Sequence, residues 1–234
     1  MTTVALSRSR SGSRVLRASA QLLRRHAVAW AWYWVLLAAV VVVMARTPLR
    51  VEVDAAGMWS TVDSAPRWFA FAMLLSLVPS GLAAHVANGL TRRAFADVLV
   101  AVAVVTALAG GVAWAVGAAV EAAVTDTTGR PVLPLILEAA AHLAAYGAAG
   151  TLVGAVYYRA GAWWGTLTLP LTVGPAVAAE TWVASGWQGE VGAALGWPSL
   201  TGPATTLLPV GVAALLLLAT RMVLSRAAIH RPGS

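Results

Sequence analysis

Six long apolar segments, separated by short stretches of charged and turn-forming residues, dominate the pattern along the chain. They run Val28–Ala45, Trp68–Ala87, Val98–Val120, Val132–Val156, Trp163–Val183 and Ala204–Leu224. Each is close to the length of about 20 residues that a helix needs to cross a hydrocarbon core about 30 Å thick. The segments are continuous and show no alternation with a period of two, so strands are not expected. The pattern predicts an all-α polytopic membrane protein with about six transmembrane helices.

The predicted six-span transmembrane domain covers residues 28–224, between cytoplasmic tails at residues 1–27 and 225–234. In the first tail, apolar side chains share one side of a helical wheel and arginines share the other. The apolar positions are Val15, Leu16, Leu22 and Leu23. This arrangement predicts an amphipathic interfacial helix in the headgroup layer, and a plain arginine-rich tail is the alternative. Residues 184–203 carry five glycines and no arginine, and they are expected to be either re-entrant or a solvated loop.

Composition strengthens the assignment to the membrane. Of 234 residues, 59% are hydrophobic and only 11% are charged, and the mean hydropathy is +0.77, whereas a soluble domain carries about 25% charged residues. All 16 basic residues are arginines, and the formal net charge is +7. Because the arginines lie between apolar segments, they indicate membrane topology and not a nucleic-acid partner. The chain has no cysteine, which excludes disulfides and thiolate metal sites, so no metal is expected.

Arginine placement also predicts the orientation. If the N-terminus is cytoplasmic, twelve arginines fall in cytoplasmic segments, and the four in outer segments are Arg46, Arg50, Arg67 and Arg130. The outer segments also hold most of the acids, namely Glu52, Asp54, Asp63, Asp126 and Glu190. The positive-inside rule therefore predicts a multi-pass protein of the cell membrane with both termini cytoplasmic. Glu180, near the outer end of the fifth segment, is expected at the membrane interface.

Enzymatic activity is not expected from this sequence, and no catalytic residue is predicted. A phosphate loop requires a lysine after its second glycine, and the chain contains no lysine. The His-Glu-x-x-His pattern of metalloproteases and the Gly-x-Ser-x-Gly pattern of serine hydrolases are also absent. If ATP drives this protein, a separate subunit binds the nucleotide.

The fourth apolar segment carries the most conspicuous polar residues within a predicted span. Glu138, His142 and Tyr146 follow at intervals of four and therefore share one face of a helix. Ionisable groups inside a membrane are costly and mark candidate sites, so these residues are a possible substrate path or proton relay. The alternative is an internal Glu–His hydrogen bond that ties helices together. On the same helix, Gly150 and Gly154 predict the close approach of a neighbouring helix.

Two short motifs follow predicted spans. Residues 88–95 read Asn-Gly-Leu-Thr-Arg-Arg-Ala-Phe after the second span, and Tyr158-Arg159-Ala160-Gly161 follows the fourth. The first resembles the Asn-Gly-x-[Ser/Thr]-Arg-[Arg/Lys]-x-Phe run of the permease subunits of ATP-binding-cassette (ABC) exporters of the ABC-2 type. The second is similar to their Tyr-Arg-x-Gly turn. Six spans, an N-terminal interfacial helix and the chain length also agree, so the resemblance covers nearly the whole chain.

The resemblance implies a transport function. Two permease copies or homologous halves would pair around a substrate path, and a cytoplasmic ATP-binding subunit would dock beneath them and bind the ATP. Gly89, Arg92, Arg93 and Phe95 would couple the permease to that ATPase. Physically, Phe95 offers a hydrophobic anchor and the arginines suit an acidic groove, although the positive-inside rule explains the arginines equally well. A stand-alone carrier or small channel driven by an ion gradient remains the alternative, and the substrate stays open among peptides, lipids and hydrophobic drugs.

Overall fold

The computed structural model describes residues 2–46, 58–125, 131–183 and 186–227, and these form helices and no strand. The helices are α1 (Thr2–Arg46), α2 (Met58–Thr61), α3 (Ser64–Ala87), α4 (Arg92–Thr125), α5 (Val132–Leu167), α6 (Leu169–Trp182), α7 (Gly186–Ala194) and α8 (Ala204–Ser225). The all-α prediction is confirmed for this part of the chain. Among the residues used to predict the orientation, Arg50, Glu52, Asp54, Asp126, Arg130 and Arg231 lie outside the described ranges.

Five of these helices are long and apolar enough to cross a membrane: α1, α3, α4, α5 and α8. The sixth predicted span, Trp163–Val183, is divided, because α5 continues to Leu167 and α6 has only 14 residues. At 1.5 Å per residue, α6 is about 21 Å long, shorter than a hydrocarbon core of about 30 Å. Pro170 lies in the first turn of α6, where its missing N–H costs no helical hydrogen bond. The described residues thus contain five candidate membrane-spanning helices, and a sixth crossing remains a prediction.

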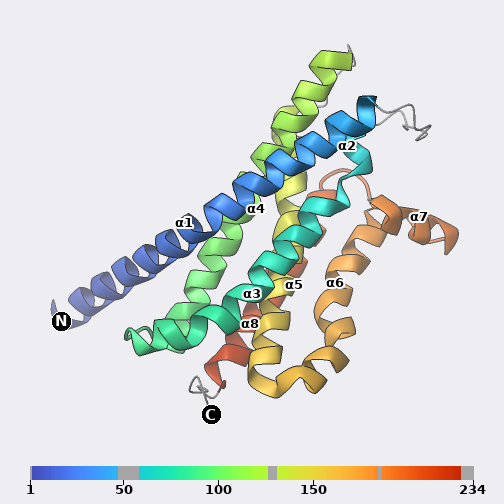
Figure 1. Ribbon diagram of the computed structural model, residues 1–234. Coiled ribbons are helices and arrows are strands. Elements are labelled where there is room, and N and C mark those ends of the chain that lie inside the picture. Colours follow the sequence, from blue (N-terminus) through green and yellow to red (C-terminus); the bar gives the residue numbers. More distant parts are fainter. Residues whose placement is uncertain (1, 47–57, 126–130, 184–185, 228–234) are drawn as a thin grey trace.

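The bundle has two distinct ends (Figure 1). The α3–α4 turn, the α5–α6 turn and the end of α8 lie at one end, whereas α2, α7 and the start of α5 lie at the other. Gly161, with a φ of 82°, breaks α5 just before the α5–α6 turn. This left-handed conformation is available to glycine at little cost, and it sharply redirects the chain after Arg159. The predicted turn at this motif is therefore present.

Helix α1 is continuous from Thr2 to Arg46, so the predicted interfacial helix is not a separate element. In its N-terminal half, Ala18 and Leu22 are buried in a core formed with α3, α4, α5 and α8. Leu16, by contrast, is 70% exposed. Part of the predicted apolar face thus contacts protein, and its position in the headgroup layer remains a prediction.

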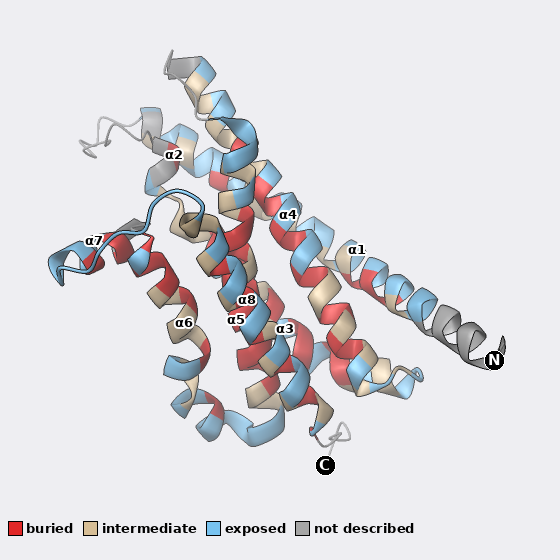
Figure 2. Cartoon of the chain, turned by 180° about the vertical axis from the view of Figure 1, so that it is seen from behind, coloured by how far each residue is buried: buried red, intermediate tan, exposed pale blue. Residues whose placement is uncertain are grey.

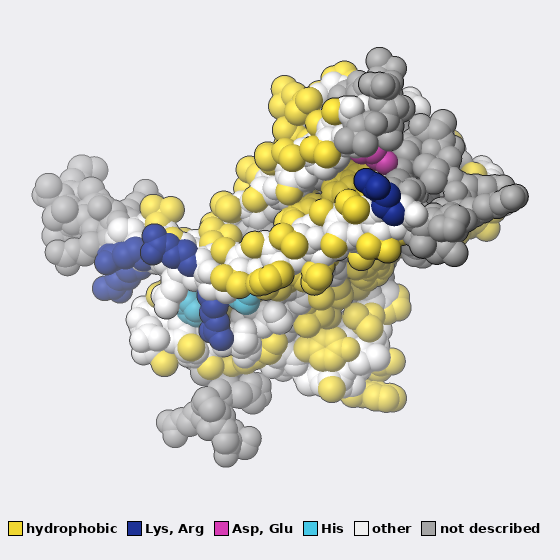
Figure 3. All heavy atoms as spheres, turned by 45° about the horizontal axis from the view of Figure 1, so that its top comes forward, with side chains coloured by type: hydrophobic (Ala, Val, Ile, Leu, Met, Phe, Trp, Pro, Cys, Tyr) yellow, Lys and Arg dark blue, Asp and Glu magenta, His cyan; other side chains and the backbone are white. Residues whose placement is uncertain are grey.

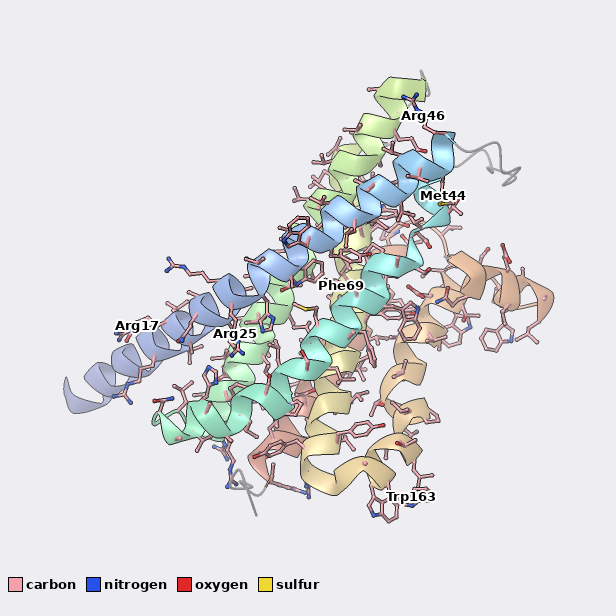
Figure 4. All side chains as sticks on the ribbon, in the orientation of Figure 1. Arg17, Arg25, Met44, Arg46, Phe69 and Trp163 are labelled. Carbon is pink, nitrogen blue, oxygen red and sulfur yellow. The ribbon has the colours of Figure 1, made fainter. Side chains whose placement is uncertain are left out.

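The two halves of α1 present different surfaces. Arginines gather on the N-terminal half, and hydrophobic side chains cover the visible face of the remainder (Figure 3). Figure 4 shows Arg17 and Arg25 along the first half and Arg46 at the far end. Between them, the Tyr33 ring stacks on that of Phe69 in α3 with centroids 4.0 Å apart. Leu37 in this half is buried as well, but Trp32, Val35 and Val42 are exposed, which suits a lipid environment.

Helix α5 forms the centre of the bundle, and most of its middle is buried (Figure 2). It contacts α3, α4, α6 and α8. Its glycines permit the closest of these contacts: a Cβ placed at Gly150 would lie 2.2 Å from the Phe71 carbonyl oxygen, and one at Gly154 would lie 2.4 Å from that of Leu75. The close approach predicted from Gly150 and Gly154 is confirmed, and α3 is the partner helix.

We expect Gly150→Ala to destabilise the protein, because the added methyl group would meet backbone and not a flexible side chain. Overpacking of this kind typically costs about 1–3 kcal/mol. Gly211→Ala in α8 is the matched control, since nothing lies within 4 Å of a Cβ at that position. Thermal unfolding in one detergent should show a lower midpoint for Gly150→Ala only. Equal midpoints for the two variants would contradict the α3–α5 contact.

Candidate functional site

A buried polar cluster joins four helices at the end of the bundle opposite the α3–α4 turn. Its members are Asp63, just before α3, Arg67 in α3, His142 and Tyr146 in α5, Glu180 in α6 and Gln188 in α7. Of these six, only Asp63 is not buried. Because its members come from segments far apart in sequence, the cluster links the start of α3 to α5, α6 and α7.

Glu180 is the centre of the cluster, and it is only 1% exposed. Its Oε1 accepts a hydrogen bond from Arg67 Nη1 at 2.6 Å, and its Oε2 accepts one from the Tyr146 hydroxyl at 2.6 Å. Arg67 also donates from Nη2 to Asp63 Oδ2 at 2.9 Å. Hydrogen bonds to charged groups are short and strong, and losing one partner leaves an uncompensated charge in the interior. The cluster therefore ties α3, α5 and α6 together only while it is complete.

His142 is a buried side chain whose hydrogen-bonding groups are unused. Its ring is 2% exposed, and neither ring nitrogen makes a hydrogen bond. The nearer nitrogen, Nδ1, lies 3.5 Å from Glu180 Oε1. Gln188 donates from Nε2 to the Tyr146 oxygen at 3.2 Å, and its own Oε1 is buried without a partner. Two unpaired ring nitrogens and one unpaired amide oxygen in one buried cluster leave room for a change of protonation or contact.

The electrostatics of the cluster oppose a second negative charge. Burial raises the pKa of Asp63 above its ordinary value, and the nearby Glu180 carboxylate acts in the same direction. The Arg67 guanidinium and His142 act against this rise, but burial is the largest cause. Desolvation disfavours the charged form of a carboxyl group, so burial favours the neutral form of Asp63.

The structure brings two of the three predicted path residues together. His142 and Tyr146 meet through Glu180 of α6. Glu138 lies one turn away on α5 and is half-buried, and the His142 ring makes no hydrogen bond to it. An internal Glu138–His142 hydrogen bond, which was the alternative interpretation, is therefore not formed.

Sequence reasoning missed the central ion pair. Arg67 was assigned to the outer loop and Glu180 to the membrane interface, but both are buried inside the bundle. The two residues are 113 positions apart, so no local pattern connects them. The one local signal was the spacing of four between Asp63 and Arg67, which places both on one face of a helix start.

At the opposite end, the predicted coupling residues form a well-defined α3–α4 turn. Gly89 has a φ of 82° and follows the end of α3, a position where glycine is favoured. The Thr91 hydroxyl accepts a hydrogen bond from the Ala94 N–H at 3.1 Å and so caps the start of α4. Arg93 is exposed and Arg92 is half-exposed. The turn thus offers arginines on a fixed backbone.

The Phe95 side chain is fully buried, with 0% of it exposed. It belongs to the apolar core shared by α1, α3, α4, α5 and α8. Its ring also lies against Gly81, where a Cβ would be 3.3 Å from Cζ, and its centroid is 5.1 Å from that of His85. The expectation that Phe95 is exposed as an anchor for a partner is wrong in this structure. The ring instead holds the start of α4 against α3.

No protein-family model, curated protein or solved structure matches this chain. Within the described ranges, no group of three histidine or acidic side chains is placed to hold a metal ion. The polar cluster joins α3, α5, α6 and α7, and the α3–α4 turn carries Arg93 at an exposed position.

We expect Glu180→Ala to lower stability strongly, because it leaves the Arg67 guanidinium buried without its main carboxylate. Breaking a buried pair from one side typically costs about 3–5 kcal/mol. The double variant Arg67→Met with Glu180→Leu should recover much of this loss, since it removes both charges. Arg221→Ala is the control: its pair with Asp97 spans 2.8 Å, but both side chains are well exposed, so it should cost at most about 1 kcal/mol.

Thermal unfolding of the four proteins in one detergent measures the effect. Equal midpoints for Glu180→Ala and Arg221→Ala would show that the buried pair does not hold the bundle together.

Proposed function

We propose that this chain is the membrane-spanning permease subunit of an ATP-driven exporter of the ABC-2 type. In this proposal two copies, or this chain and a homologous half, form the substrate path, and a separate cytoplasmic subunit binds ATP. The motif resemblance in residues 88–95 and 158–161 supports the proposal. The observation that carries it is the α3–α4 turn, which is short, capped on both sides and bears exposed Arg93.

The proposed orientation places both termini and the α3–α4 turn in the cytoplasm of a cell with this chain in its plasma membrane. The α5–α6 turn lies at the same end of the bundle (Figure 1), where Trp163 and Trp164 are exposed. Exposed tryptophans are typical of a membrane–water interface. The polar cluster then lies toward the outer surface.

In this proposal the α3–α4 turn couples the permease to the ATPase, but Phe95 has a different role from the one predicted. Gly89 sets the shape of the turn, Arg92 and Arg93 contact an acidic groove on the ATPase, and Phe95 fixes the turn to the bundle. Force on the turn then passes through the Phe95 ring to α3 and α1, which share its core. A buried aromatic ring transmits displacement because protein cores are close-packed.

The path assigned to Glu138, His142 and Tyr146 has a structural requirement. His142 and Tyr146 are enclosed within a single chain, so they contact a cargo only if α6 and α7 move away from α5. The half-buried Glu138 is closer to an accessible position. We therefore propose that the polar cluster closes the outer part of the path.

A gradient-driven carrier or small channel is the second candidate, and one observation favours it. Carriers place titratable groups inside the bundle, and Asp63, His142 and Glu180 are gathered around one arginine. The absence of an ATP-binding partner in purified complexes would make this the leading proposal.

We expect Arg93→Glu to reduce recovery of the ATPase without lowering thermal stability, because Arg93 is exposed. Reversing a contact charge turns attraction into repulsion. Arg24→Glu is the matched control, since Arg24 is an exposed arginine of α1 away from the turn. Phe95→Ala is less informative for docking, because removing a buried phenylalanine typically costs about 3–5 kcal/mol by itself.

The measurement is affinity purification of tagged wild type, Arg93→Glu and Arg24→Glu from native membranes in one mild detergent. A co-purified protein counts only if mass spectrometry shows that it carries a phosphate loop. Equal recovery with Arg93→Glu and wild type would exclude the turn as the docking site. No such ATPase with the wild type would exclude the exporter proposal.

A further inference from the structure

The polar cluster contains an imbalance of charge. Within the described ranges, the Asp63 and Glu180 carboxylates face one arginine, Arg67, and an imidazole that is neutral or positive according to its protonation. If His142 is neutral and both carboxylates are ionised, these groups carry one excess negative charge. A net charge in a protein interior is costly, and titratable groups usually change protonation to avoid it.

We infer that His142 and Glu180 form a proton-binding site, and that the bound proton holds α5, α6 and α7 together at this end of the bundle. This goes beyond the proposed export function, because ATP-driven transport does not itself require a proton. The proton comes from water at this end and returns to it, so no other reactant is needed.

The geometry of His142 fits this role. Both ring nitrogens are buried without a hydrogen bond, and Nδ1 is 3.5 Å from the Glu180 Oε1 that also accepts from Arg67. An imidazolium has two N–H donors. One of them can close the gap between Nδ1 and Glu180 Oε1. Protonation would therefore add a hydrogen bond between α5 and α6.

Charged and titratable side chains from several helices surround His142. Asp63 and Arg67 face it from the start of α3, Glu180 from α6 and neutral Gln188 from α7, while Tyr146 and half-buried Glu138 lie on α5 itself. On α4, the Glu121 carboxylate accepts a hydrogen bond from the Trp59 N–H. The other charged groups of α4 lie at the opposite end of the bundle, and they are Arg92, Arg93 and Asp97. Arg221 of α8 pairs with Asp97 at that end. Burial raises the pKa of Asp63, so Asp63 is the competing site for the same proton.

Loss of the proton would weaken a specific connection. Glu180 and Tyr146 join α6 to α5, and Gln188 extends the connection to α7. With His142 neutral and both carboxylates ionised, Asp63 and Glu180 repel each other across Arg67. The ends of α6 and α7 would then separate more easily from α5, which is the movement that an outer opening requires.

Nitrogen-15 NMR of histidine-labelled protein in detergent tests the site directly, because the chain has only four histidines. The His142 signal is the one missing from His142→Gln. Over about pH 5 to about pH 8, where imidazole titrates, we expect an imidazolium signal for His142 that disappears toward alkaline pH. In Glu180→Gln it should disappear at lower pH, because a neighbouring carboxylate favours the imidazolium. Glu190→Gln, on the exposed face of α7, should match wild type.

A neutral His142 throughout the range, or a titration unchanged by Glu180→Gln, would overturn the proton site. If Glu180→Gln does not fold, Asp63→Asn serves instead and should shift the titration in the same direction. The wild-type titration alone can also overturn the proton site, if His142 is neutral throughout the range.

Distance measurement tests the holding role. The chain has no cysteine, so Thr61→Cys with Glu190→Cys places two spin labels at exposed positions of α2 and α7. We expect a narrow distance distribution when His142 is protonated and a broader or longer one when it is neutral. In the same pair combined with His142→Gln, the distribution should not change with pH. A wild-type distribution that stays constant while His142 loses its proton would overturn the holding role.

Discussion

The close approach of α5 to α3 is the contact on which the rest of the structure depends. Gly147, Gly150 and Gly154 leave so little space that a methyl group would overlap Leu74 or the backbone of α3. Without a hydrophobic driving force between helices in lipid, this kind of tight packing is what holds a membrane bundle together. Because α4, α6 and α8 also pack on α5, a shift of α5 would disturb every layer of the bundle.

That central contact separates two ends of different chemistry. At one end, five helices share an apolar core that includes Phe95 and Leu82, and the α3–α4 turn stands on it. At the other end, Arg67 and Glu180 form a buried ion pair. An apolar core resists rearrangement, whereas a polar cluster changes strength with protonation. In the proposed function, the ATPase would contact the apolar end and the path would open at the polar end.

Local sequence patterns predicted the helices well and the tertiary contacts poorly. Long apolar runs predict helices because the backbone in lipid must satisfy its own hydrogen bonds, and Gly150 with Gly154 correctly predicted a close contact. The run from Trp163 did not reveal its division, which depends on Gly161 and Pro170 together. Phe95 next to a loop suggested exposure, but its burial depends on where α1 and α3 meet α4. The Arg67–Glu180 pair joins distant segments and has no local signature.

The central claim is that the α3–α4 turn and the polar cluster lie on opposite sides of a membrane. Single cysteines test it cleanly, because the chain has none of its own, and Asn88→Cys and Glu190→Cys both place the thiol at exposed positions. With a membrane-impermeant maleimide added to intact cells, Glu190→Cys should react at once and Asn88→Cys only after the cells are permeabilised. Reaction of both positions from the same side, or the reverse order, would contradict the account.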